Sequence, residues 1–299
     1  KERVLVGFRE RYGAFVADMQ SCAVLKPSIA AQLENLAATI LTMDAKRAIP
    51  QIEVACGDEQ DALVFRHLEP LSEQDLETLR DFARNSGISV LLQPKGPSSI
   101  VALEPSSVEL SFALPDFGVE LAFGPSDFVQ VNGAMNRRMV ERAVSLLDPG
   151  EDDRVLDLFC GLGNFTLPLA RRVAGVTGVE GEAGLVRRAR ENSAHNEIGN
   201  AEFHVADLEG DNELAPWARR SYDKVLLDPP RSGAAGMMDM LGRMRPGRTV
   251  YVSCHPGSLA RDAGRLVNEF GYTLTAAGVM DMFPHTAHVE SIAVFESNA

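Results

Sequence analysis

Short apolar segments alternate with helical patterns along the second half of the chain, from about Phe128 onward. Segments 154–159, 224–227 and 248–253 carry the branched and aromatic residues typical of buried strands. Strands that alternate with helices indicate a parallel sheet with crossover helices. The pattern therefore predicts an α/β fold with an open, mostly parallel sheet over residues 125–299.

The first part of the chain mixes strand and helix signals. Residues 52–55 and 62–66 resemble a hairpin across Gly57 and Asp58. A helix is predicted over 72–86, because Ser72 is a good N-cap and Asp75 stands at the third helical position. We expect a smaller α+β domain over residues 1–124, and this part carries no recognisable catalytic motif.

The charge balance is acidic, with a net charge of −13. By itself, this argues against a nucleic-acid partner, which normally requires a basic surface. Of the 29 basic residues, however, 24 are Arg, the residue best suited to paired contacts with phosphates and to stacking on bases. The Arg clusters are equally consistent with RNA contacts and with solvated helix faces.

Cysteine use and hydropathy indicate the compartment. The four Cys residues are scattered without a C-x-x-C pair, so neither a zinc site nor a disulfide framework is predicted. No apolar segment approaches the roughly 20 residues of a membrane span, and the N-terminus does not resemble an export signal. We therefore expect a cytoplasmic protein with free thiols and no membrane contact.

A glycine-containing loop follows the strand at 154–159, and a helix is expected after it over 165–173. Gly161 and Gly163 allow a sharp turn close to a ligand, and Glu180 ends the next strand, where an acid can accept hydrogen bonds from ribose hydroxyls. A dinucleotide site would require a third Gly at position 166, which is Thr166 here. Asp157 suits a cationic ligand better than a pyrophosphate. We therefore favour S-adenosylmethionine over a dinucleotide, with Asp207 placed to reach the adenine.

Three reactive side chains follow or enter the remaining strands. Asp228 begins a rigid Asp-Pro-Pro-Arg loop, and Cys254 follows the strand at 248–253. A Cys at a strand end is either a nucleophile or a small buried apolar residue, and this location favours the nucleophile. Glu290 enters an apolar strand that we expect over 285–291, which makes it a candidate general base. His285 and His288 are more consistent with structural or substrate-contacting roles than with a metal site.

Several motifs resemble those of one known family. They are V-L-D-L-F-C-G-L-G-N-F-T-L-P-L-A at 155–170, D-P-P-R-S-G at 228–233, S-C-H-P-G-S-L-A-R-D at 253–262, H-V-E-S at 288–291 and F-V-Q-V-N at 128–132. This set resembles the RNA uracil-5-methyltransferases, and most of all the members that act on 23S ribosomal RNA and carry an iron–sulfur cluster.

The resemblance implies an activity and a set of roles. Residues 125–299 would form a Rossmann-like, class I S-adenosylmethionine-dependent methyltransferase domain, and residues 1–124 an RNA-facing domain. The enzyme would act as a monomer and methylate carbon 5 of a uridine in ribosomal RNA, giving 5-methyluridine. Cys254 would be the nucleophile and Glu290 the base. The residues expected to contact S-adenosylmethionine are Gln130, Phe159, Asn164, Glu180, Asp207 and Asp228.

The chain departs from the family pattern at three places. His255 stands where the family has Asn, and Asp207 where the ribosomal RNA enzymes tend to have Asn. Of the four Cys ligands of the family's 4Fe-4S cluster, only one has a counterpart, Cys22. One thiolate does not hold such a cluster, so we expect the cluster only in a longer chain that also carries the family's N-terminal barrel.

Other activities compete with this interpretation. A transfer-RNA uracil-5-methyltransferase is the nearest relative, and a catalytically silent RNA-binding fragment is the alternative from another class. RNA cytosine-5 methylation also uses a Cys, but it typically places Pro-Cys where this chain has Pro229 and Pro230.

Overall fold

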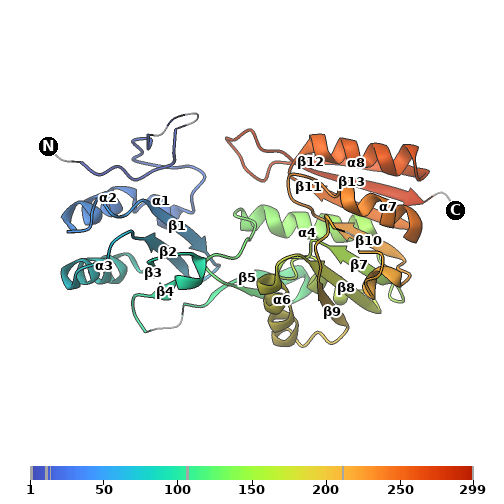
Figure 1. The fold of residues 1–299 in the computed structure, drawn as a ribbon, viewed down its shortest axis with the longest axis horizontal. Helices are drawn as coiled ribbons and strands as arrows, with labels where there is room; N and C mark the ends of the chain where they lie inside the picture. Colours follow the sequence, from blue (N-terminus) through green and yellow to red (C-terminus); the bar gives the residue numbers. More distant parts are fainter. Residues whose placement is uncertain (1–2, 11–12, 14, 106–107, 211, 298–299) are drawn as a thin grey trace. The chain divides into compact units, whose positions relative to one another are not determined.

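The computed structural model describes residues 3–10, 13, 15–105, 108–210 and 212–297 (Figure 1). The chain divides into two compact units. One unit is Lys1–Ser111 with Gly124–Asp127, and the other is Phe112–Phe123 with Phe128–Ala299. Among the described residues, no helix has both the length and the apolar character that a membrane span requires.

The first unit is a four-stranded sheet covered by helices. Its strand order is β1-β2-β3-β4, in which β2 and β3 are parallel and the outer pairs antiparallel. The predicted hairpin is confirmed as β1 and β2. The elements are α1 (Pro27–Ala30), α2 (Leu33–Thr42), β1 (Gln51–Cys56), β2 (Asp61–Arg66), α3 (Glu73–Ser86), β3 (Ser89–Gln93), η1 (Pro97–Ser99) and β4 (Val101–Ala102).

Local sequence signals explain where α3 begins and ends. The Ser72 hydroxyl accepts a hydrogen bond from the Asp75 N–H, and the Asp75 carboxylate accepts one from the Ser72 N–H, which confirms the predicted cap. Gly87 ends the helix with φ of 71°, a conformation that glycine adopts without strain. The helix buries Leu79 and Phe82 against Phe65 of β2.

The second unit is built on a seven-stranded sheet. Its order is β12-β13-β11-β10-β7-β8-β9. Strands β7 to β11 run parallel, and β13 is antiparallel to both of its neighbours. This is the predicted α/β sheet. The strands are β7 (Arg154–Leu158), β8 (Gly175–Glu180), β9 (Ala201–Val205), β10 (Lys224–Leu227), β11 (Arg248–Ser253), β12 (Tyr272–Met280) and β13 (Glu290–Ser297).

Helices cover this sheet. The helix α4 contacts β10, β11 and β13, while α7 and α8 pack together and α8 contacts β11, β12 and β13. The central strands are mostly apolar, and Leu156, Leu227 and Tyr251 are completely buried in the core between strands and helices. The helices are α4 (Gly133–Leu147), α5 (Thr166–Ala170), α6 (Ala183–His195), η3 (Trp217–Arg219), α7 (Ala235–Met244) and α8 (Pro256–Asn268).

The helix α5 is shorter than the sequence predicts. The apolar pattern predicts a helix over 165–173, but α5 ends at Ala170. The side-chain amide of Asn200 donates hydrogen bonds to the Ala170 and Val173 carbonyls, both at 2.9 Å. These bonds satisfy carbonyl groups that a continuing helix would use internally, so the chain turns here.

The boundary between the units also differs from the predicted one at residue 124. A hairpin of β5 (Leu110–Leu114), η2 (Pro115–Phe117) and β6 (Val119–Phe123) contributes residues 112–123 to the second unit. Two Asn side chains explain this, Asn192 of α6 and Asn196, which directly follows the helix. Asn192 exchanges hydrogen bonds with the N–H and C=O of Ala122, at 2.9 and 3.1 Å. Asn196 likewise exchanges hydrogen bonds with the N–H and C=O of Glu120, at 2.8 and 2.6 Å. The two amides thus act as a partner strand for β6.

We predict that Asn192→Ala destabilises the second unit by about 1–3 kcal/mol, because it removes a buried side chain and its hydrogen bonds to the Ala122 backbone and to the Leu162 carbonyl. Chemical denaturation measures this difference. Asn196→Ala is the comparison, since that side chain is half-buried and water can replace it. An Asn192→Ala loss no larger than the Asn196→Ala loss would contradict the argument.

Candidate active site

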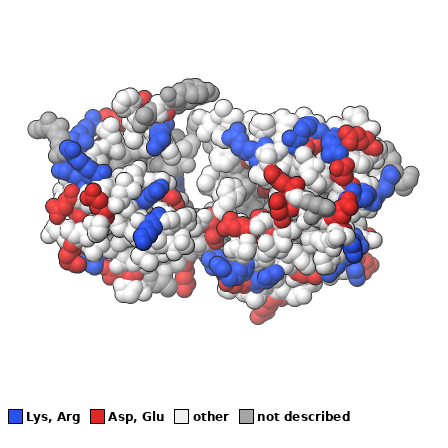
Figure 2. Space-filling model, in the orientation of Figure 1, with Lys and Arg blue, Asp and Glu red and all other residues white. Residues whose placement is uncertain are grey.

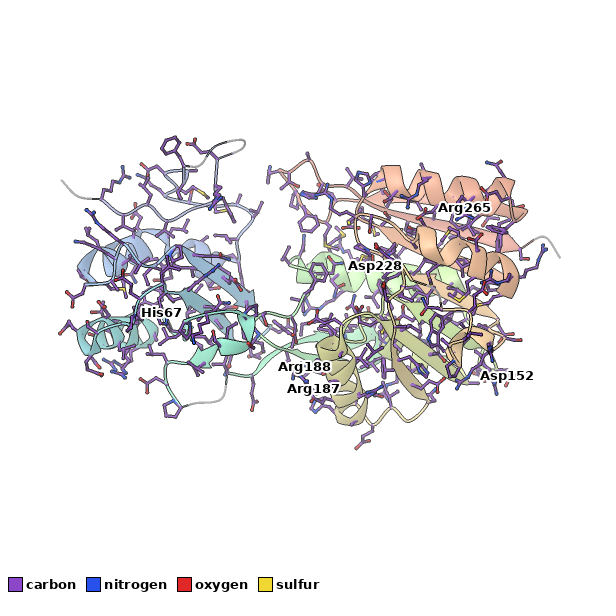
Figure 3. All side chains as sticks on the ribbon, viewed as in Figure 1. His67, Asp152, Arg187, Arg188, Asp228 and Arg265 are labelled. Atoms are coloured by element: carbon purple, nitrogen blue, oxygen red, sulfur yellow. The ribbon has the colours of Figure 1, made fainter. Side chains whose placement is uncertain are left out.

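The predicted reactive residues of the second unit meet at one edge of its sheet. Strands β7, β8, β9, β10 and β11 are parallel, so their carboxyl ends lie at the same edge. The strand order reverses between β7 and β10, which is where open α/β sheets bind ligands. Asp228 follows β10 directly and lies at this edge (Figure 3).

The antiparallel strand β13 brings Glu290 to the same edge. Because β13 runs against β11, its first residue lies at the end where β11 finishes. Ser253 pairs with Ser291, so Cys254 and Glu290 are the next residues on each side of this strand pair. The strand begins at Glu290, whereas the sequence pattern predicts a strand from 285. Residues 285–289 form a loop instead, in which His285 has φ of 66°.

The loop after β7 is shaped for close approach of a ligand. Gly161 and Gly163 have φ of 55° and 100°, and Phe159 has φ of 63°, which is rare for a bulky residue. The Glu180 carboxylate at the end of β8 accepts hydrogen bonds from the N–H groups of Gly161 and Glu182, at 3.1 and 3.0 Å. These bonds fix an acid beside the loop, as the sequence predicts for a ribose-binding residue.

Asp157 is a fully buried carboxyl group below this loop. Thr166 donates a hydrogen bond to its Oδ2 at 2.5 Å, whereas its Oδ1 has no hydrogen-bond partner among the described residues. Burial raises the pKa of Asp157 to about 8, and the charges of Asp228 and Glu180 add to the rise, which the Thr166 hydrogen bond opposes. A buried oxygen without a partner is costly, so the site suits a ligand that brings a cation or a donor.

The acidic edge also controls the thiol. Burial raises the pKa of Cys254, and the charges of Glu290 and Asp228 raise it further, while Arg231 opposes them. Burial and the Glu290 charge raise the pKa of Asp228 to about 7, and burial raises that of Glu290. From the sequence we expect surroundings that favour the thiolate of Cys254, but burial and the two nearby acids favour the protonated thiol instead.

The remaining predicted cofactor residues occupy loops around the edge. Gln130 is half-buried in the segment before α4. Asn132 anchors that segment, since its side-chain amide donates to the Met282 carbonyl at 3.1 Å. Asn164 exchanges two 3.0 Å hydrogen bonds with Asn136 of α4, a partner that the sequence analysis does not identify. Asp207 is exposed after β9 and accepts a hydrogen bond from the Glu209 N–H at 3.0 Å.

Two other cysteines take no part in this edge. Cys160 is buried against Gly178, where an added Cβ would stand 3.0 Å from its sulfur, so it packs as an apolar residue. Cys22 belongs to the first unit. In the described part of the chain, no group of three or more His, Cys, Asp or Glu side chains is arranged to hold a metal ion, so the residues present do not fit an iron–sulfur cluster.

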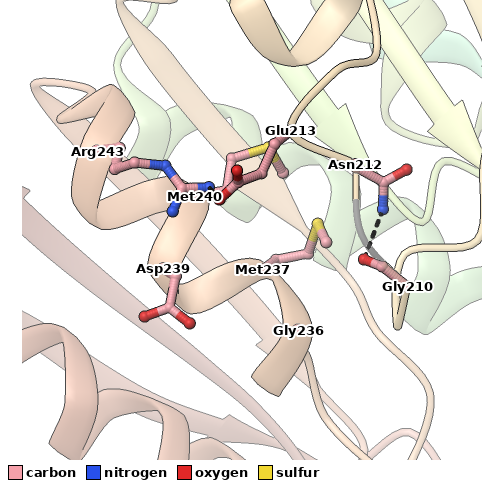
Figure 4. Close-up of a pocket in the computed structure, with 8 residues that line it drawn as sticks. All are labelled: Gly210, Asn212, Glu213, Gly236, Met237, Asp239, Met240 and Arg243. Carbon is pink, nitrogen blue, oxygen red and sulfur yellow. Dashed lines mark hydrogen bonds and ion pairs between the residues drawn. The ribbon is translucent and has the colours of Figure 1, made fainter.

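A shallow pocket of about 150 Å³ lies between α7 and the loop after β9 (Figure 4). Asn212 and Gly210 share a hydrogen bond of 3.0 Å at one side, and Glu213 and Arg243 form an ion pair of 3.0 Å at the other. The pocket is smaller than the roughly 300 Å³ of typical ligand sites. None of the predicted site residues lines it, so the sheet edge remains the candidate site.

Comparison with known proteins identifies the family. A family model described as tRNA (Uracil-5-)-methyltransferase matches residues 29–298. A 23S rRNA (uracil(1939)-C(5))-methyltransferase RlmD of Xanthomonas axonopodis pv. citri is 58% identical over 296 residues, which cover 99% of this chain and 67% of that protein. The chain belongs to the tRNA (uracil-5-)-methyltransferase family. A Stenotrophomonas maltophilia protein of the same name as the Xanthomonas one is 56% identical to the chain described here, with the same coverage of both proteins.

Solved structures agree with the fold. The Pyrococcus abyssi tRNA (uracil-54, C5)-methyltransferase, in complex with S-adenosyl-L-homocysteine, superposes with a TM-score of 0.72 at 24% identity, covering 98% of this chain and 74% of that one. The M. jannaschii tRNA m1G37 methyltransferase gives 0.55 at 12% identity, covering 83% of this chain and 75% of that one. The second unit is therefore a class I methyltransferase fold. The chain is an S-adenosylmethionine-dependent RNA (uracil-5-)-methyltransferase, and it spans about two thirds of the length of the curated relatives it matches.

The site fits this cofactor. S-adenosylmethionine carries a sulfonium and an ammonium, both cations. The buried Asp157 Oδ1 that lacks a partner and the acids around it provide complementary charge.

We predict that the alkylation rate of Cys254 in the cofactor-free enzyme rises at a higher pH than that of the same thiol in the denatured chain, because the thiolate reacts and burial and the nearby acids raise its pKa. Iodoacetamide labelling followed by peptide mass spectrometry measures this rate. Asp228→Asn removes one of the charges that raise this pKa, so it should lower the midpoint, the pH at which the labelling rate is half-maximal. Asp239→Asn, an exposed acid on α7, is the control and should not move it. A midpoint for the folded wild-type enzyme at or below that of the denatured chain would contradict the prediction.

Proposed function

We propose that this enzyme transfers a methyl group from S-adenosylmethionine to carbon 5 of a uridine in 23S ribosomal RNA, giving 5-methyluridine. The observation that carries the choice of RNA is the 55–58% identity to several proteins named as 23S rRNA (uracil(1939)-C(5))-methyltransferases. The solved tRNA (uracil-54, C5)-methyltransferase of Pyrococcus abyssi is only 24% identical to this chain, so it supports the fold and not the substrate. Ribosomal RNA as the substrate implies a cytoplasmic enzyme.

The chemistry requires a nucleophile, because carbon 5 of uracil is a poor one by itself. The Cys254 thiolate adds to carbon 6, and the electron pair of the carbon 5–carbon 6 double bond becomes available at carbon 5. Carbon 5 would then take the methyl group of the bound sulfonium, while the methyl–sulfur bond breaks and S-adenosylhomocysteine is left. Glu290 removes the proton from carbon 5, the double bond reforms, and the thiolate leaves carbon 6.

The geometry supports these roles. Cys254 and Glu290 lie beside the Ser253–Ser291 pair, at the same end of the paired strands β11 and β13. A uracil ring held there would present carbon 6 to the thiol and carbon 5 to the carboxylate. The raised pKa of Glu290 suits a group that must accept a proton from carbon. A uridine must leave any base stack to reach this edge, as is usual for bases that undergo chemistry.

The predicted cofactor contacts follow the loops of the same edge. Glu180 would accept hydrogen bonds from the ribose hydroxyls, and Asp207 from the adenine amine. Asp228 would lie beside the transferred methyl group, between the cofactor and Cys254. Gln130, Phe159 and Asn164 complete the predicted set, which comes from one unit of one chain, and we therefore propose that the enzyme acts as a monomer.

The first unit is proposed to face the RNA. On the face of the molecule that Figure 2 shows, basic and acidic side chains are intermixed on both units and do not form one basic surface. Arg187 and Arg188 of α6 are among the Arg residues of the catalytic unit (Figure 3). Arg side chains that contact phosphates would make RNA binding by this chain weaken as salt is added.

A covalent trap tests the proposed function. Incubation of the enzyme with S-adenosylmethionine and 23S ribosomal RNA that contains 5-fluorouridine should give a stable protein–RNA adduct, since fluorine does not leave as a proton does. The adduct should depend on the cofactor, and Cys254→Ala should abolish it and lose turnover while S-adenosylhomocysteine binding is kept. Methylation by Cys254→Ala, or an equal yield on fluorinated transfer RNA, would refute the proposal.

We predict that Glu290→Gln still adds to RNA but releases it slowly, because no base removes the carbon 5 proton. Its turnover should fall by about 10²–10⁴-fold, the range of general-base catalysis. Gel electrophoresis of enzyme mixed with ordinary, unfluorinated RNA should reveal the accumulated adduct. Glu296→Gln, an acid at the other end of β13, is the matched control. Normal turnover by Glu290→Gln would mean that another base is used.

A further inference from the structure

Asp262 of α8 is a completely buried carboxylate that holds several donors. Its Oδ2 accepts hydrogen bonds from the Tyr251 hydroxyl at 2.7 Å and from the Ala234 N–H at 2.8 Å. Its Oδ1 accepts one from Arg261 Nε, also at 2.8 Å. A charged acceptor with three donors forms strong, directional bonds, so Asp262 fixes all three groups relative to α8.

Arg261 extends this contact to the neighbouring loop. Its Nη2 donates a hydrogen bond to the Ser232 carbonyl at 2.8 Å. Between the two held residues lies Gly233, whose φ is 84°. A Cβ at Gly233 would stand 2.5 Å from Arg261 Nη2 and 2.6 Å from Asp262 Oδ2, so the loop backbone lies directly against the pair. Residues 232–234 are thereby clamped at both ends.

The same pair is connected to the nucleophile. The helix α8 begins at Pro256, two residues after Cys254, and His255 caps it by accepting a hydrogen bond from the Ser258 N–H at 3.1 Å. Tyr251, the hydroxyl partner of Asp262, lies on β11 three residues before Cys254. The clamped loop, in turn, begins with Asp228 after β10. One buried carboxylate therefore contacts both chain segments that flank the reactive edge.

We propose that Asp262, acting with Arg261, is a positioning residue that sets the distance between the loop 228–234 and Cys254. The inference rests on the proposed function, in which this loop lies beside the methyl group and the thiol attacks the base. Methyl transfer requires the reacting atoms to be aligned, and a misplacement of 1 Å costs up to about 10²-fold in rate. Asp262 and Arg261 themselves contact no reacting atom.

The test uses Asp262→Asn, which has the same shape but replaces one accepting oxygen with an NH₂ donor. In either orientation of the amide, that donor faces Tyr251 and Ala234 or Arg261. We expect the single-turnover rate at saturating S-adenosylmethionine and RNA to fall about 10- to 100-fold. Because saturation removes any effect on binding, weakened cofactor affinity alone would not produce this fall.

Hydrogen exchange gives a second readout that does not depend on activity. The Ala234 N–H should exchange faster in Asp262→Asn than in the wild-type chain, while the peptides of β7 and β8 remain unchanged. If the wild-type chain methylated no RNA, the proposed function would fail, and this measurement would still decide whether the clamp exists. Unchanged exchange at Ala234 would overturn the inference even in an active enzyme.

Two further variants separate positioning from stability. Arg261→Gln removes the bond to Ser232 and the donor to Asp262 Oδ1 at a half-exposed side chain, so its melting temperature is recorded beside the rate. Measured well below that temperature, its rate at saturation should still fall about tenfold. It decides the matter if Asp262→Asn does not fold. Asp239→Asn removes an ion pair of 2.7 Å between α7 and Arg265 of α8, without touching the loop, and should react normally. A normal rate for Arg261→Gln would overturn the proposal.

Discussion

Several carboxyl groups share one edge of the seven-stranded sheet, and their mutual repulsion is the constraint on which the site depends. Burial and neighbouring charges raise the pKa of Asp157 to about 8 and that of Asp228 to about 7. Negative charges brought together away from water destabilise a fold unless they bind protons or a cation. S-adenosylmethionine supplies such a cation, so cofactor binding relieves a strain that the folded enzyme retains.

The direction of one strand makes chemistry possible at that edge. Parallel strands deliver only their carboxyl ends, which explains the loops of Phe159, Asp207, Asp228 and Cys254. Glu290 begins a strand, and only an antiparallel strand can place its beginning there. The proposed nucleophile and base are 36 positions apart in the chain, yet the register of β11 and β13 makes them neighbours.

The sequence predicts those parts of this arrangement that depend on local pattern. Apolar segments with branched residues predict β7, β10 and β11, and the residue after each strand is then at the ligand-binding edge. Residues whose partners are distant in sequence were not predictable in this way. Asn192 looks like an ordinary helix residue, yet its side-chain amide pairs with the Ala122 backbone of β6 as a neighbouring strand would. This pairing places β6 in the second unit. Asp262 reads as one polar residue on an amphipathic helix, and only the fold shows that three donors surround it.

The electrostatics of the edge also order the steps of the proposed reaction. A thiolate at Cys254 would add a further negative charge beside Glu290 and Asp228, and these charges raise the pKa of the thiol in the free enzyme. A bound sulfonium reverses this balance, since its charge attracts the thiolate and the carboxylates alike. In the proposed reaction, Cys254 would therefore be most reactive when the methyl donor is already in place. In the proposed reaction, the acidic edge would thus protect the thiol from unproductive reactions until the methyl donor is bound, which gives the acids a function at a site whose chemistry requires an anion.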